Sequence, residues 1–280
     1  MTVSVLIVGL GNMGDALLGG LLAKERNKEM DLFLYDTHPA KLEKYKEHRN
    51  VTLLTDLNDQ TLHDKTVVLC IKPHDLIAFS KNFSNNTKKP SLVISIMAGT
   101  SLESIEKILH FTGPMIRAMP NVAAKVGHAA TAICHNTHCL DEHRHQATAI
   151  FSAVGDVYWT KEGLMDTVTG LSGSGPAYLY MVIEALTDGG VKMGLPRDLS
   201  AALATQTVLG AATLVKKSGT HPAILKDQVS TPGGTTISAL HALESSGLRS
   251  MFVDAVCIAT ERSSYLGRKL QEELTKQTQD

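Results

Sequence analysis

Apolar residues in the first 160 positions gather in short runs, and each run is followed by a segment with apolar residues three or four positions apart. The runs have few polar breaks and many branched side chains, which is typical of strands buried on both faces. Alternation of such strands with helices predicts a doubly wound α/β domain, built on a parallel sheet, over residues 1–160. The expected strands are Val5–Val8, Asp31–Tyr35, Val67–Ile71, Leu92–Ile96, Pro114–Arg117 and Val157–Trp159.

The pattern changes after Lys161, where the strand signals stop and long, alanine-rich helical patterns begin. Apolar residues occupy more than one face of these helices, as Leu203, Val208 and Leu209 show in one of them. A helix that is apolar nearly all round must be covered by others, and a domain of roughly 120 residues buries so many faces poorly. The sequence therefore predicts an all-helical dimerisation domain over residues 161–280.

The stretch from Val5 to Gly14 carries the clearest chemical signal, because a strand, a glycine-rich turn and a helix follow one another. The glycines have the spacing G-x-G-x-x-G, which in this context indicates dinucleotide binding by a Rossmann-type domain. The first glycine allows the tight turn, the second lets the backbone approach a pyrophosphate, and the third lets the helix pack closely. A glycine-rich turn without a ligand is the alternative. We expect the cofactor, NADPH or NADH, to bind at Gly9, Leu10, Gly11, Asn12, Met13 and Gly14.

The second expected strand ends at Asp36, where a carboxylate can accept hydrogen bonds from the adenosine ribose and repels a 2′-phosphate. By that rule Asp36 favours NADH. His38 and Lys41 follow closely and could soften the repulsion. The alternative is that Asp36 caps a helix that begins near Pro39.

Further cofactor contacts are expected where other strands end, since ligands of open α/β sheets bind at the carboxyl ends of the strands. Lys72 would bring a cation to this edge and Pro73 would make the turn rigid, although Lys72 could equally be solvated. Small residues around Ala98 would let the nicotinamide ring approach the backbone. Asn58, in a loop, is a candidate for the adenosine side. Ser101 is expected to cap the following helix.

A second anion site is predicted in the helical half, at Pro232–Thr236. Two glycines and two threonines stand directly before an amphipathic helix. The unpaired N–H groups of Gly234, Thr235 and Thr236 would face one point and, with the helix dipole, attract a carboxylate. An ordinary helix cap is the alternative reading.

The composition narrows the partners and the location. A net charge of −1 gives no sign of nucleic-acid binding, and 43% apolar with 20% charged residues is usual for globular proteins. We expect no membrane-spanning segment, because no apolar run was found to approach the roughly 20 residues that cross a membrane. The first strand follows Met1 so closely that no leader peptide is expected. Four scattered cysteines favour the reducing cytoplasm.

The segment Cys134–His145 contains two cysteines and four histidines, which invites a zinc interpretation. Its spacing matches none of the usual paired ligand patterns, and the acidic residues Asp141 and Glu142 suggest a solvated helix start. We therefore expect no metal site.

With both halves in view, the chain resembles the pyrroline-5-carboxylate reductase family from Gly9 to about Arg268. The likeness rests on Gly9–Gly14, Ile71–Pro73, Arg117–Asn121, Ser172–Tyr178 and Pro232–Thr236, and on the helix that ends before Gly247–Arg249. Of these motifs, Ser172–Tyr178 and Pro232–Thr236 are the most specific.

This resemblance implies NAD(P)H-dependent reduction of the cyclic imine 1-pyrroline-5-carboxylate to L-proline, the last step of proline synthesis. It implies a helical dimer, five of which can form a decamer. It also implies that Glu162, Thr231, Gly234, Thr235 and Thr236 bind the substrate. Two departures stand out: Thr231 replaces a usual serine, and Asp36 replaces the small or basic residue common in members that prefer NADPH. A third, His128–Ala130 in place of a glycine-rich segment, has no assigned consequence.

The chemistry implied is hydride transfer from the nicotinamide to the imine carbon. Thr236 is the candidate catalytic residue and would orient or relay a proton to the ring nitrogen, because an alcohol is a poor acid at neutral pH. Glu162 could favour the protonated imine through its charge, although it could also be a solvated glutamate before a helix.

Three alternative functions can be compared with the sequence. A β-hydroxyacid dehydrogenase would need a lysine on the helix after Ser172–Pro176, and none occurs before Lys192. A ketol-acid reductoisomerase would need more helix carboxylates for two magnesium ions than Glu184 and Asp188 supply. A non-catalytic NAD(P)-binding regulator would keep the glycine loop but would have no reason for the Pro232–Thr236 anion site.

Overall fold

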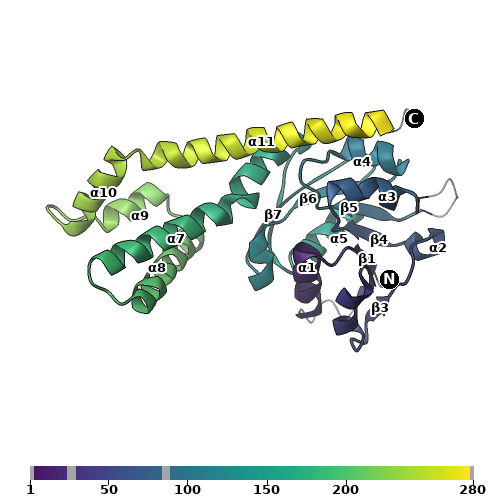
Figure 1. Cartoon of the computed structure of the whole chain (residues 1–280), viewed down its shortest axis with the longest axis horizontal. Helices are drawn as coiled ribbons and strands as arrows, with labels where there is room; N and C mark the ends of the chain where they lie inside the picture. The colour runs from purple at the N-terminus through teal and green to yellow at the C-terminus, as the bar shows by residue number, and fades with distance from the viewer. Residues whose placement is uncertain (1–2, 24–29, 84–88, 278–280) are drawn as a thin grey trace. The chain divides into compact units, whose positions relative to one another are not determined.

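The computed structural model describes residues 3–23, 30–83 and 89–277 (Figure 1). The chain forms two compact units. The sheet unit comprises residues 1–174 and 258–280, and the helical unit comprises residues 175–257. The first unit thus continues to residue 174, beyond the boundary expected at residue 160. The chain also returns to the sheet unit at residue 258, within the last helix.

The sheet unit is built on eight strands in the order β3-β2-β1-β4-β5-β6-β7-β8. The first six by chain position are parallel, with the strand order typical of a Rossmann-type domain, and the order reverses between β1 and β4. The strands are β1 (Val3–Val8), β2 (Met30–Tyr35), β3 (Val51–Leu53), β4 (Thr66–Leu69), β5 (Leu92–Ser95), β6 (Met115–Met119), β7 (Ala129–His135) and β8 (Gly155–Trp159).

Strands β7 and β8 modify the expected parallel sheet. β7 runs antiparallel to β6, and β8 pairs parallel to β7, so the sheet is mostly rather than wholly parallel. The sequence did not indicate β3 or β7. β3 is only three residues long, and β7 begins with the small residues Ala129 and Ala130, which have weak strand preference.

Helices cover both faces of the sheet, which confirms the doubly wound architecture. Val5 and Ile7 of β1 pack in one core with α1 (Asn12–Ala23) and α5 (Asp141–Phe151), while Leu6 and Val8 point into the other. That second core contains α2 (Asp59–Leu62), α3 (Leu76–Ser80), α4 (Leu102–Leu109) and Met165 of α6 (Met165–Val168). Short 3₁₀ turns complete the unit at Pro39–Lys41, Glu43–Tyr45, Pro73–Asp75, Val122–Val126 and Glu162–Leu164, and a π-helical turn spans Thr169–Gly173.

The helical unit is built from helices alone, as the sequence predicted. It contains α7 (Gly175–Lys192), α8 (Arg197–Ser218), α9 (Pro222–Gln228), α10 (Thr235–Ser245) and the first part of α11 (Leu248–Gln277). α7 and α8 pack together at Ser200, whose hydroxyl donates a 2.7 Å hydrogen bond to the carbonyl of Thr187.

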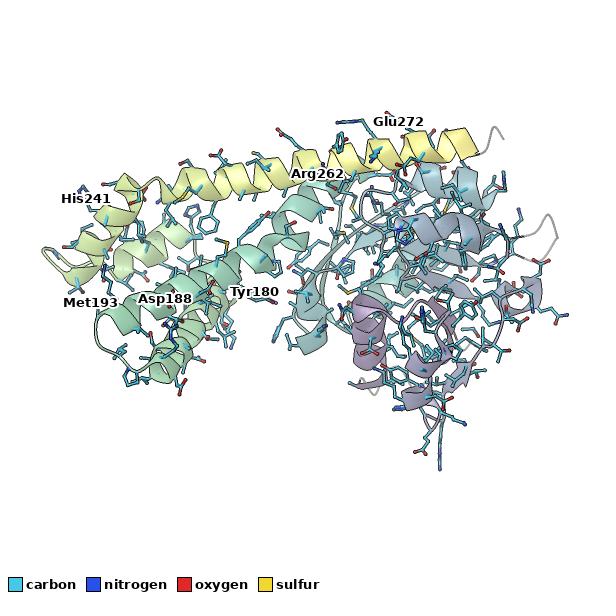
Figure 2. All side chains as sticks on the ribbon, viewed as in Figure 1. Tyr180, Asp188, Met193, His241, Arg262 and Glu272 are labelled. Carbon is cyan, nitrogen blue, oxygen red and sulfur yellow. The ribbon has the colours of Figure 1, made fainter. Side chains whose placement is uncertain are left out.

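This unit has almost no core of its own. Within residues 175–257 only Thr187, Ser200 and Ala204 are buried. Large apolar side chains lie on its surface, among them Tyr180 and Met193, which are 60% and 84% exposed (Figure 2). Such faces are the physical basis for the dimerisation that the sequence predicted.

One sequence expectation needs correction here. Helix α8 is 22 residues long and contains an 18-residue stretch with a mean hydropathy of 1.2, so by length and composition it is apolar enough to cross a membrane. The sequence interpretation overlooked it because Arg197, Asp198 and two terminal lysines flank the apolar stretch. The same composition suits a helix covered by a second subunit.

Candidate active site

The glycine loop after β1 has the geometry that its three glycines were expected to provide. Gly9 has φ of 95°, and a Cβ atom there would lie 2.8 Å from the carbonyl oxygen of Cys70. A Cβ on Gly14 would lie 2.1 Å from the carbonyl oxygen of Gly9, so α1 packs directly on the turn. A Cβ on Gly11 would meet open space. The loop thus leaves its backbone accessible where a pyrophosphate would lie.

A cavity of about 720 Å³ opens beside this loop, at the carboxyl ends of β1, β2 and β4. Its lining brings together four predicted cofactor residues, which are Gly9, Gly11, Asp36 and Lys72. Thr37, His38 and Lys41 line the side next to Asp36. This is the switch point of the strand order, where α/β sheets bind nucleotides.

Asp36 is buried, and its carboxylate is held from three directions. Oδ2 accepts a 2.7 Å hydrogen bond from the Leu10 N–H, and Oδ1 accepts a 2.8 Å bond from the His38 N–H. Lys41 Nζ lies 3.2 Å from both oxygens. Burial alone would raise the pKa of Asp36, but the hydrogen bonds from His38, Leu10 and Lys41 outweigh it and lower the pKa below its usual value. Asp36 therefore remains ionised and ties the β2 loop to the glycine loop.

The other strand-end candidates lie differently. Lys72 is exposed on the cavity wall, and Pro73 starts the 3₁₀ turn that follows β4. Asn58 caps α2: its side-chain oxygen accepts hydrogen bonds from the N–H groups of Gln60 and Thr61. The oxygen is thus already engaged, and a cofactor contact by Asn58 stays a prediction.

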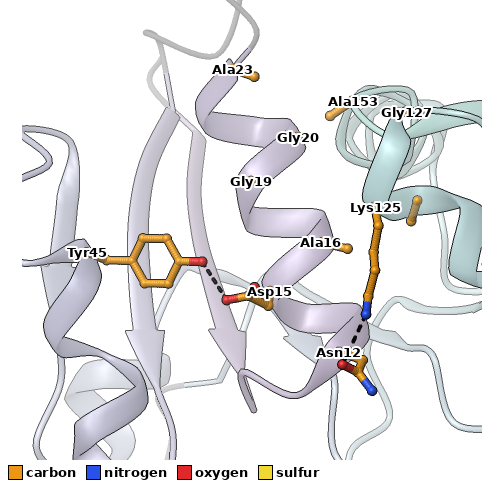
Figure 3. A pocket seen from close by; sticks show the side chains of 11 residues that line it. Asn12, Asp15, Ala16, Gly19, Gly20, Ala23, Tyr45, Lys125, Gly127 and Ala153 are labelled. Atoms are coloured by element: carbon orange, nitrogen blue, oxygen red, sulfur yellow. Dashed lines mark hydrogen bonds between the residues drawn. The ribbon is translucent and has the colours of Figure 1, made fainter.

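Asn12, at the start of α1, contacts a residue that the sequence interpretation missed. Its Oδ1 accepts a 3.2 Å hydrogen bond from Lys125, which therefore lies beside the amino end of α1 (Figure 3). The two residues also line a second cavity of about 550 Å³ on the outer side of α1, where Tyr45 donates a 2.6 Å bond to Asp15. No local motif links Asn12 with Lys125, since 113 positions separate them.

The turn after β5 carries Ala98, the expected neighbour of the nicotinamide. Ala98 is exposed, and Gly99 has φ of 67°. Gly267 of α11 packs on this turn so closely that a Cβ there would lie 2.6 Å from the Gly99 carbonyl oxygen. Ser101 caps α4 as predicted, accepting a 3.1 Å hydrogen bond from the Ser104 N–H.

Glu162 reaches the same region. Its Oε1 accepts a 2.6 Å hydrogen bond from the N–H of Leu102, at the start of α4. Arg117, buried in β6, lies 3.8 Å from Glu162 and 3.9 Å from Asp166. Ser263 and Ser264 each donate a 2.8 Å hydrogen bond to Asp166. Glu162 is therefore a fixed carboxylate rather than a freely solvated one, and Arg117, noted only within a motif, is the cation that balances it.

The residues of the predicted anion site lie at the start of α10, and anion binding there stays a prediction. Gly234 is the N-cap of α10, and its N–H donates a 3.0 Å hydrogen bond to the carbonyl of Thr231, so it is not available as expected. A Cβ on Gly234 would lie 2.3 Å from the Thr231 hydroxyl oxygen. Thr235 and Thr236 are the first two helical residues, and their N–H groups have no acceptor within the helix.

Within the cysteine- and histidine-rich segment, Cys134, His135 and His143 make packing or hydrogen-bond contacts. Cys134 is buried in β7, and burial raises the pKa of its thiol to about 12. His135 lies edge-on to Trp159, and His143 accepts a 2.9 Å hydrogen bond from the Leu140 N–H. Across the described residues, no three His, Cys, Asp or Glu side chains form a group that could hold a metal ion.

Comparisons with known proteins cover both units. A family model described as pyrroline-5-carboxylate reductase dimerisation matches residues 162–266, and one described as NADP oxidoreductase, coenzyme F420-dependent, matches residues 4–99. The pyrroline-5-carboxylate reductase of Synechocystis is 42% identical over 269 residues, 96% of this chain and 100% of that relative.

Solved structures agree. The pyrroline-5-carboxylate reductase of Coxiella burnetii has a TM-score of 0.86 at 32% identity, over 95% of this chain and 99% of that one. The pyrroline carboxylate reductase of Plasmodium falciparum, solved with NADP bound, has a TM-score of 0.77 at 31% identity, over 95% and 98% of the two chains.

The Rossmann-type sheet, its glycine loop and the helical dimerisation domain define an NAD(P)-dependent oxidoreductase that forms homo-oligomers. Within that class the chain belongs to the pyrroline-5-carboxylate reductase family, which confirms the resemblance drawn from its motifs.

Proposed function

We propose the following roles for the two sites of this enzyme, which reduces 1-pyrroline-5-carboxylate to L-proline with hydride from NADPH or NADH. The glycine loop and the adjoining cavity hold the cofactor, and the α10 amino terminus holds the substrate carboxylate. The nicotinamide, when bound, would supply the hydride that reduces the imine carbon, and a proton would be added to the ring nitrogen. Membership of the family, with a relative that is 42% identical over nearly the whole chain, supports this reaction.

The cofactor's pyrophosphate would lie on the backbone of Gly9–Gly14, with N–H groups of the first turn of α1 as donors. The open space at Gly11 and the cavity beside it support this position. The adenosine would extend toward Asp36 and Lys72, and the nicotinamide toward Ala98. The Plasmodium falciparum relative, solved with NADP bound, supports a nicotinamide cofactor of this kind.

The substrate carboxylate would be bound by the N–H groups of Thr235 and Thr236, supported by the dipole of the 11-residue helix α10. Gly234 and Thr231 shape this site through the turn that joins them. Holding the carboxylate orients the imine for attack, and such positioning can contribute several kcal/mol to the barrier reduction.

Thr236 is the proposed donor to the ring nitrogen and orients or relays the proton. Glu162 is the proposed source of negative charge that favours the protonated imine, which is a better electrophile. Its hydrogen bond from Leu102 and its proximity to Arg117 support a defined position for the carboxylate.

We also propose a dimer formed by the helical units, five of which assemble into a decamer. The exposed apolar side chains of residues 175–257 support a dimer core, and α8 lies within the region matched by the dimerisation model, which favours a buried interface helix over a membrane span. Four free cysteines support a cytoplasmic location. No nucleic-acid or membrane partner is proposed.

Steady-state oxidation of NADPH, and separately of NADH, by the purified protein with 1-pyrroline-5-carboxylate tests the function. We expect turnover with L-proline formed in a one-to-one ratio to oxidised cofactor. A folded protein that binds both cofactors but turns over neither would remove the reductase assignment and favour a regulator.

A further inference from the structure

The environment of Asp36 conflicts with the usual interpretation of an acidic residue at the end of β2. A carboxylate there is expected to bind the ribose hydroxyls of NADH and to repel the 2′-phosphate of NADPH. In this chain the side chain is only 5% exposed, although Asp36 lines the cavity. A carboxylate so enclosed offers the ribose little free surface.

The hydrogen bonds of Asp36 show what it does instead. One oxygen accepts from the N–H of Leu10 in the glycine loop, and the other accepts from the N–H of His38 after β2. These bonds link the two loops that border the cavity. Asp36 therefore acts as a brace within the protein.

Lys41 completes this arrangement. Its ammonium ion lies 3.2 Å from each Asp36 oxygen, yet the side chain remains 45% exposed and lines the cavity. The short distance neutralises the charge that would repel a phosphate. An ammonium ion has three donors, so a bound phosphate can be contacted while the Asp36 contact is kept.

The neighbouring side chains reinforce a site for an anion. Thr37 and His38 line the same side of the cavity and offer a hydroxyl and an imidazole. The charged groups on the remaining wall are Lys72, Lys81 and Asp75, of which two are cationic.

We infer that Lys41 determines the choice of cofactor in this enzyme: it neutralises Asp36 and binds the 2′-phosphate, so that NADPH is used despite the acidic residue. This inference rests on the proposed function, since it concerns the cofactor of that reaction. The preference between NADPH and NADH is thus predicted from the pair Asp36–Lys41 rather than from Asp36 alone.

The test compares Lys41→Met, Lys41→Arg and the wild type by the ratio of kcat/KM with NADPH to kcat/KM with NADH. Lys41→Met should lower this ratio at least about tenfold, mainly through KM for NADPH, because a bare carboxylate then faces the phosphate. Lys41→Arg should keep the ratio within about threefold, since the cation remains. Lys44→Met is the matched control, because Lys44 pairs with Asp15 outside this cavity and its loss should leave the ratio unchanged.

A binding measurement makes the test independent of turnover. Adenosine 2′,5′-bisphosphate, titrated calorimetrically, should bind Lys41→Met about tenfold more weakly than the wild type. An unchanged cofactor ratio and unchanged affinity in Lys41→Met would overturn the inference. Selective loss of NADH use in Asp36→Asn would also overturn it, since a brace should affect both cofactors alike. Absence of turnover by the wild type with either cofactor would instead contradict the proposed function, and the calorimetric result would still decide the role of Lys41.

Discussion

At the scale of single residues, the glycines of α1 differ in what surrounds them. Gly14 faces the carbonyl oxygen of Gly9 at a distance that admits no side chain, whereas Gly19, in the same helix, has open space around it. The first therefore sets how closely the helix approaches the glycine loop, and the second has no such role.

The contrast gives a matched pair of substitutions. Gly14→Ala should destabilise the protein by about 1–3 kcal/mol through overpacking and raise KM for the cofactor. Gly19→Ala should stabilise it by about 0.5–1 kcal/mol, because alanine favours a helix interior. Urea unfolding of both variants at one protein concentration measures the difference; equal effects would show that the close approach at Gly14 is unimportant.

The lowered pKa of Asp36 predicts a pH dependence of stability. The unfolded carboxyl has a pKa of about 3.9, so the stabilisation is fully present above that value and is lost as the pH falls through the lower folded pKa. From about pH 5 to pH 3, the free energy of unfolding should fall less in Asp36→Asn than in the wild type. Parallel losses in the two proteins would show that Asp36 is not responsible.

At the scale of elements, patterns in the sequence predicted long and strongly apolar segments well and short or mixed ones poorly. Strand β1 contains the expected strand Val5–Val8, and α7 and α8 lie in the half that was predicted to be helical, since their apolar patterns are long or unbroken. β3 and β7 were missed because they are held by pairing with neighbours rather than by local preference.

The candidate site shows the same limit. The glycine loop could be predicted because its residues are consecutive. The Lys125–Asn12 contact and the position of Arg117 beside Glu162 depend on side chains that are distant in sequence. The use of the Gly234 N–H within its own turn is a detail of backbone geometry that a motif does not specify.

The amino terminus of α10 supports a prediction at this scale. Thr236→Ala should lower kcat/KM for 1-pyrroline-5-carboxylate about tenfold or more if its hydroxyl contacts the reacting ring. Thr236→Ser keeps the hydroxyl and should retain most of the activity. Steady-state kinetics with saturating cofactor measures both, and an unchanged kcat/KM in Thr236→Ala would exclude the hydroxyl from the mechanism.

At the scale of the whole molecule, the two units have different means of stability. The sheet unit contains two cores of buried apolar side chains, while the helical unit has three buried residues and exposes Leu203 and Leu209 of α8. A unit with so little core needs a partner surface. Its match to a dimerisation domain identifies that partner as a second copy of the chain.

Replacing Leu203 with glutamate should therefore weaken the dimer. Leu203 is 51% exposed in the single chain, and placing a charge in an apolar interface should raise the dimer dissociation constant at least about 100-fold. Leu140→Glu is the control, because Leu140 is 62% exposed but lies in the sheet unit. Sedimentation velocity reports the result; a dimer unaffected by Leu203→Glu would place the interface elsewhere.

Direct hydride transfer to the imine can be followed with an isotopic label on the cofactor. The enzyme should be turned over in ordinary water with 1-pyrroline-5-carboxylate and NADPH carrying deuterium at the transferred position of nicotinamide C4. Direct hydride transfer predicts L-proline with one deuterium on the ring carbon that had been doubly bonded to nitrogen, seen by mass spectrometry and NMR. Proline without that deuterium, or no proline at all from a folded protein that binds NADPH, would contradict the account.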